Sequence, residues 1–131
     1  MPTLSVWSIR LSLIHLVVAW AIGATMMLAP AWSWPINTAA LFEVHVAAAL
    51  FGWFFQFVIG VAYRMLPTFG RDRGRPVAAW TSIAAINLGV IWTAIGAFGT
   101  WAPPVVSTSC WFIAAGCFAW HIWPRVKAFG A

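Results

Sequence analysis

Few residues in this sequence could do chemistry, and most of them interrupt long apolar runs. They are His15, Glu43, His45, Gln56, Arg64 and His121. Polar and ionisable side chains inside apolar segments are energetically costly and usually functional. The familiar catalytic patterns are missing from the sequence, which has no HExxH, CxxC, CxxCH or Glu-xx-His motif and no glycine-rich phosphate loop. The chain has two acidic residues, so few carboxyl groups are available for general acid–base catalysis. We therefore expect no enzyme activity from this chain on its own.

His45 is the strongest candidate for a ligand, because neutral imidazole is the commonest protein ligand of metals and haem. If the surrounding segment is helical, the positions inward of His45 on its own face are small or polar: Ala48, Ala49, Gly52, Gln56 and Gly60. A row of small side chains opens a flat slot against which a porphyrin ring can lie. The alternative is that these residues pack against a neighbouring helix while His45 hydrogen-bonds a backbone carbonyl. For His15 and His121 we expect structural roles.

The elements that position these residues follow from composition. The 131 residues are 63% hydrophobic and 7% charged, with a mean hydropathy of +0.91, whereas a soluble domain has about 25% charged residues. The surrounding solvent must therefore be lipid, and the lipid bilayer is the expected partner. Proline-rich breaks divide the chain into four expected helices that form a single transmembrane domain, at residues 7–28, 38–66, 77–99 and 105–123.

The basic residues predict the orientation of these helices. They gather in three segments, near the start (Arg10), between the second and third helices (Arg64, Arg71, Arg73 and Arg75) and after the fourth (Arg125 and Lys127). The turns after the first and third helices carry no Lys or Arg. The positive-inside rule then places both termini and residues 67–76 in the cytoplasm, most simply of a bacterial plasma membrane. The net charge of +5 reflects this topology, and we expect no nucleic-acid partner.

Short turns between successive helices predict an all-α, up-down-up-down four-helix bundle. On the third helix, Ala85, Gly89 and Thr93 form a line of small residues spaced four apart. Such a line allows two helix backbones to approach closely. We interpret it as a packing feature.

One segment resembles a known family. Residues 43–70, EVHVAAALFGWFFQFVIGVAYRMLPTFG, resemble helix two of subunit I in the haem–copper oxidase and nitric-oxide reductase superfamily, with matching positions at His45, Gly52, Gly60, Tyr63, Leu66 and Pro67. Residues 8–30, SIRLSLIHLVVAWAIGATMMLAP, are similar to helix one of that subunit. The third and fourth helices match it only in hydropathy and order.

The resemblance implies that His45 is an axial ligand of a b-type haem on the outer side of the membrane. The orientation predicted from the basic residues places His45 in the same half. The family's other ligands lie on later helices that have no counterpart in this sequence, so no binuclear centre is expected. A second axial ligand would come from Met26 or Met27, or from His45 of a second chain in a homodimer. The predicted haem-binding residues are His45, Ala49, Gly52, Gln56, Met26 and Met27.

Three functions are compatible with these residues. The first is a b-type haem protein for electron transfer or for sensing of haem or a gas. The second is a non-catalytic accessory subunit of a larger respiratory or photosynthetic membrane complex. The third is a copper-handling protein, since the imidazole of His45 and the thioethers of Met26 and Met27 suit Cu(I).

Overall fold

The described part of the chain is all-helical. The computed structural model describes residues 3–65, 75–99 and 101–126. Four helical segments are long and apolar enough to cross a membrane, Thr3–Leu28, Thr38–Met65, Pro76–Phe98 and Pro104–Ile122. They confirm the prediction of a multi-pass membrane protein in contact with a lipid bilayer. Large apolar side chains such as Val17, Trp20 and Met27 are exposed on the outside of the bundle, where lipid chains solvate them.

The helix ends follow from local chemistry. The first helix, α1 (Thr3–Leu28), begins earlier than predicted and ends just before Pro30. The next, α2 (Thr38–Val46), starts at Asn37, whose side chain accepts a hydrogen bond from the Ala40 amide at 3.2 Å. The other two long helices, α4 (Pro76–Phe98) and α5 (Pro104–Ile122), each start with a proline, which has no amide hydrogen to leave unpaired.

The sequence predicts one continuous α-helix for the second span, but the structure shows an interruption. A π-helix, η1 (Ala47–Phe55), separates α2 from α3 (Gln56–Met65). A π-helix has more residues per turn, so it changes which side chains share a face. Ala47, Ala48 and Gly52 are buried in this segment, whereas Ala49 is only half-buried. The predicted end of the second span at residue 66 and most of the predicted central turn lie outside the described residues.

A polar seam joins α1 to the second span. The buried hydroxyl of Ser5 donates to the Gly60 carbonyl at 2.7 Å, and that of Ser8 donates to the Gln56 carbonyl at 2.7 Å. Residue numbers therefore rise along α1 as they fall along α3. In a membrane, where both helix faces and lipid chains are apolar, small residues and interhelical hydrogen bonds of this kind hold helices together.

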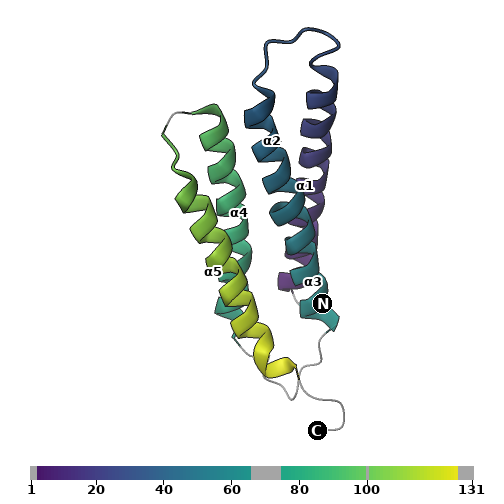
Figure 1. Ribbon diagram of the computed structural model, residues 1–131. Coiled ribbons are helices and arrows are strands. Elements are labelled where there is room, and N and C mark those ends of the chain that lie inside the picture. Colours follow the sequence, from purple (N-terminus) through teal and green to yellow (C-terminus); the bar gives the residue numbers. More distant parts are fainter. Residues whose placement is uncertain (1–2, 66–74, 100, 127–131) are drawn as a thin grey trace.

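The helices α4 and α5 form the second pair (Figure 1). The Ser82 hydroxyl donates to the Ala114 carbonyl at 2.8 Å. Gly89 lies against Trp111, so closely that a β-carbon at Gly89 would stand 2.5 Å from the indole nitrogen. Gly89 thus serves packing of α4 on α5, by admitting a large side chain of α5. A buried apolar cluster that includes Ile59, Ile83 and Ala114 connects the two pairs.

The close contact at Gly89 makes a prediction about stability. In Gly89→Ala the new methyl group would meet the Trp111 indole, which is also stacked on Phe51 with ring centres 3.9 Å apart. We expect a loss of about 1–3 kcal/mol of stability, measured by denaturant titration in detergent with circular dichroism. Gly116→Ala is the matched control, since nothing lies within 4 Å of a β-carbon there. Equal stability of the two variants would contradict the close packing of α4 on α5.

Candidate functional site

His45 lies on α2 and faces α1. Its Nδ1 is 2.9 Å from the Ala19 carbonyl oxygen. The half-buried ring rests on Gly23, where a β-carbon would stand 3.0 Å from Cε1 of His45. A glycine at this position of α1 therefore makes room for the imidazole.

The hydrogen bond to Ala19 defines the tautomer of His45. A carbonyl oxygen can only accept, so Nδ1 carries the proton and Nε2 keeps a free lone pair in the neutral ring. Among the described residues Nε2 takes part in no hydrogen bond, and it is not one of the buried polar atoms that lack a partner there. Nε2 is therefore neither bonded to the described residues nor fully enclosed by them. Metal-ligating histidines have this arrangement, with one ring nitrogen bound to a carbonyl or carboxylate and the other on the metal.

The slot predicted below His45 is filled by α1. A β-carbon at Gly52 would stand 2.6 Å from both Cγ and Cδ2 of His15, and one at Gly60 would stand 2.9 Å from Cγ1 of Ile9. Ala48, between them and His45, is fully buried. The small residues therefore serve helix–helix contact, the alternative interpretation, and they do not fit a porphyrin ring on this face. The residue pattern of the second span does not reveal this contact, because the side chains that complement its glycines belong to α1.

His15 and His45 occupy equivalent positions across the contact of α1 with the second span. Each ring lies against a glycine of the other span, His15 on Gly52 and His45 on Gly23. Nδ1 of His15 lies 3.0 Å from the Leu11 carbonyl of its own helix. Neither the reciprocal pairing nor the role of Gly23 was found from the sequence, although both follow once glycines are matched with histidines on adjacent spans.

The remaining predicted haem-binding residues are spread over this region. Met26 and Met27 lie on α1 about one turn beyond Gly23, and Met27 is 83% exposed. Gln56 is fully buried in α3, and neither its oxygen nor its nitrogen has a hydrogen-bond partner among the described residues. The defined contacts of His45 are thus with Ala19 and Gly23 of α1.

His121 helps to join three elements at the other end of the bundle. It is buried, and its Nδ1 lies 3.0 Å from the Arg75 carbonyl oxygen. Its ring stacks on that of Tyr63, with ring centres 4.7 Å apart. The Arg75 guanidinium lies over the Trp120 ring at 4.7 Å. These contacts tie the end of α3, the start of α4 and the end of α5 together. They agree with the structural role expected of His121.

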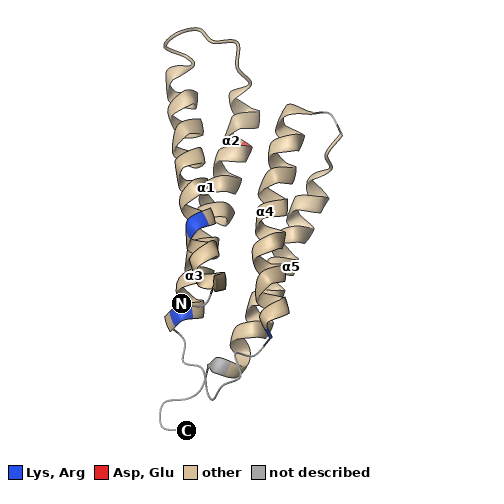
Figure 2. Cartoon of the chain, turned by 180° about the vertical axis from the view of Figure 1, so that it is seen from behind, with Lys and Arg blue, Asp and Glu red and all other residues tan. Residues whose placement is uncertain are grey.

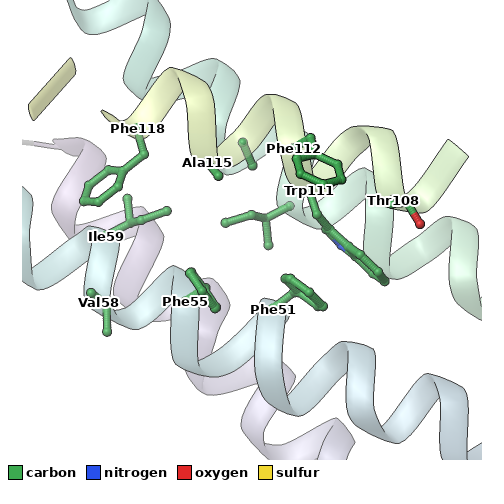
Figure 3. A pocket seen from close by; sticks show the side chains of 11 residues that line it. Phe51, Phe55, Val58, Ile59, Thr108, Trp111, Phe112, Ala115 and Phe118 are labelled. Carbon is green, nitrogen blue, oxygen red and sulfur yellow. The ribbon is translucent and has the colours of Figure 1, made fainter. Parts of the chain in front are cut away.

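A cavity of about 400 Å³ between the second span and α5 was not predicted (Figure 3). Its walls are mainly apolar, with five aromatic side chains, Phe51, Phe55, Trp111, Phe112 and Phe118. Phe51 and Trp111 stack face to face, with ring centres 3.9 Å apart and planes 5° apart. No imidazole, thioether or thiol lines this cavity, so it does not fit a group that needs a protein ligand for iron.

Within residues 3–65, 75–99 and 101–126, no three His, Cys, Asp or Glu side chains come together as a metal site. Cys110 and Cys117 are free thiols on α5. In comparisons with known proteins, no family model, no curated protein and no solved structure matches this chain. The site therefore has to be interpreted from its own chemistry.

The filled slot makes a prediction that two substitutions can check together. Gly52→Ala should lower stability by about 1–3 kcal/mol, because the added methyl group overpacks the contact with the His15 ring. In a His15→Ala background the same change should be much milder, since the ring is gone. The measurement is a double-mutant cycle of unfolding in detergent. Gly116→Ala, which meets nothing within 4 Å, should have the same effect in both backgrounds. An equal effect of Gly52→Ala with and without His15 would mean that the slot is open.

Proposed function

We propose that this protein is a small b-type haem-binding membrane protein in which Nε2 of His45 binds the iron. One observation carries the proposal. The Ala19 carbonyl holds Nδ1 of His45 at 2.9 Å, which orients the ring and leaves Nε2 as an accessible lone-pair donor. The resemblance of residues 43–70 to a helix that carries a haem ligand supports the same residue.

The filled slot limits how a haem can be held. Because His15, Ile9 and Ser8 cover the glycines of the second span, a haem would be held outside the contact of α1 with that span. His45 would hold it, together with Met27, which is 83% exposed on α1, or with His45 of a second chain. Haem bound in this way would supply one-electron exchange or gas binding, and we propose electron transfer or haem or gas sensing rather than catalysis by this chain.

The closed packing of α1 on the second span favours a second function, that of an accessory subunit of a larger membrane complex. His45 and His15 each fill the space above a glycine of the other span, and His45 also bonds the Ala19 backbone. In an accessory subunit of a larger membrane complex, these histidines would act only as interhelical contacts. A protein with this function would have no cofactor.

Absorption spectroscopy separates the two functions. Protein purified from haem-replete cells should show a Soret band and a b-type pyridine hemochrome, and His45→Ala should abolish both, because the substitution removes the iron ligand. His15→Ala is the matched control, since it removes the other imidazole of the same contact and should keep the Soret band. Metal analysis of the same samples tests the copper-handling alternative with His45, Met26 and Met27.

A colourless native protein, stable and free of copper, would reject the haem proposal in favour of the accessory subunit. Retention of the full Soret band in His45→Ala would show that haem binds elsewhere. Circular dichroism of each variant shows whether it is folded.

We also propose that the spans form an up-down-up-down bundle in a bacterial plasma membrane, with both termini and residues 67–76 in the cytoplasm. The distribution of charge supports this orientation. Among the described residues, the basic ones lie in the half of the bundle where α1 and α4 begin and α5 ends, and the acidic one lies in the other half (Figure 2). Cytoplasmic segments carry an excess of Lys and Arg.

Cysteine labelling in intact cells tests the orientation. In a Cys110→Ser, Cys117→Ser background, an impermeant maleimide should label Ser33→Cys, in the turn between α1 and α2, from outside the cell. Thr68→Cys, in the predicted cytoplasmic segment, should react only after permeabilisation. The unsubstituted background controls for other reactions. Labelling with the opposite preference would reverse the proposed orientation.

A further inference from the structure

The aromatic cavity is independent of the His45 site. It lies between η1 and α3 on one side and α5 on the other, and its volume is about 400 Å³ (Figure 3). Pockets that bind small molecules span about 300–1,000 Å³. Figure 3 shows side chains of both walls pointing into the space between the helices, including Phe51, Phe55 and Trp111. The cavity is thus large enough to bind part of a small molecule.

The walls carry no charged side chain and few polar atoms. Thr108 and Trp111 are the only lining residues with a polar side-chain atom. The Thr108 hydroxyl donates to the Pro104 carbonyl at 3.0 Å. The Trp111 indole nitrogen is buried against Gly89 of α4 and has no hydrogen-bond partner among the described residues. No Lys, Arg, Asp or Glu lines the cavity. A complementary ligand must therefore be uncharged and without polar groups in the part that binds, because a buried polar group without a partner is costly.

The cavity is accessible from the hydrocarbon core of the bilayer. Its lining residues all belong to the three spans Thr38–Met65, Pro76–Phe98 and Pro104–Ile122. Phe55, Val58 and Phe112 are exposed beside it, whereas Ile59 and Ala114 are buried. A molecule that enters from this side comes from the lipid phase, where the abundant apolar molecules are long hydrocarbon chains.

From this complementarity we propose that the cavity binds one hydrocarbon chain of a membrane lipid. The occupant we expect is the acyl chain of a phospholipid, the most abundant chain-bearing molecule of a bilayer, and the chain of a polyisoprenoid is the alternative that the experiment distinguishes. An empty cavity of this size would leave its aromatic walls without dispersion contacts on one side, and a chain lying between Phe51, Phe55 and Phe118 restores them. The proposal does not depend on haem binding at His45.

Retention of lipid by the purified chain tests the proposal. Ala115→Trp places a large side chain in the cavity, and Ala84→Trp adds the same side chain at an exposed position of α4 that does not line it. Each protein is purified in dodecyl maltoside, and its retained lipids are extracted and quantified by mass spectrometry. We expect equimolar chain-bearing lipid on the native protein and on Ala84→Trp, and several-fold less on Ala115→Trp. The identity of the extracted molecule distinguishes phospholipid from polyisoprenoid.

A second measurement does not require Ala115→Trp to fold. Dioleoyl phosphatidylcholine with brominated chains quenches nearby indoles, so the native protein should lose more fluorescence to this lipid than Trp111→Phe does. Competition by unbrominated phosphatidylcholine or by a polyprenol shows which chain is preferred. Equal lipid retention by the two Trp variants, or quenching unaffected by Trp111→Phe, would overturn the proposal. So would a change in oligomeric state of Ala115→Trp without loss of lipid, because a second chain would then occupy the cavity.

Discussion

The close contact between α1 and the second span is the constraint on which the candidate site depends. The hydrophobic effect does not drive the two helices together, because lipid chains are as apolar as the helices themselves. The contact is made instead by glycines that admit a side chain from the other helix and by hydroxyls that donate to backbone carbonyls. His45 over Gly23, His15 over Gly52 and Ser8 on the Gln56 carbonyl are three forms of this solution. The orientation of His45 is therefore a consequence of how the helices pack.

The geometry at His45 is compatible with a haem-binding protein and with an accessory subunit without cofactor. The two functions differ in what Nε2 of His45 binds. The bond from Nδ1 to Ala19 would hold the ring in place for a ligand, and it would equally tie α2 to α1 in a protein without cofactor. Nε2 decides between them, because it is either bonded to iron or left with no role. The side-chain amide of Gln56 is fully buried and has no described hydrogen-bond partner. An unpaired buried amide destabilises the folded protein, so we expect Gln56 to have a function that offsets this cost.

The aromatic cavity follows from how the two helix pairs meet. The helices α4 and α5 are held together by the Gly89–Trp111 contact and by the bond from Ser82 to Ala114. The second span reaches α5 through the large rings of Phe51 and Trp111, and rings of this size separate two helices where they meet. Small residues thus produce the tight contacts of this protein, and large aromatic residues produce its open space. The π-helix in the second span carries Phe51 and also Phe55, a further ring in the cavity wall.

The sequence by itself determined that this is a multi-pass membrane protein with four spans, because long apolar runs bounded by prolines have no other stable environment. It also identified His45 as a distinctive residue and Gly89 as a point of close helix contact. Only the tertiary structure decided what lies against each small residue. The row from Ala48 to Gly60 predicts a gap equally well whether a cofactor or a neighbouring helix fills it, and the structure places His15 and Ile9 there. The cavity could not be predicted for the same physical reason, since its walls are side chains far apart in the sequence.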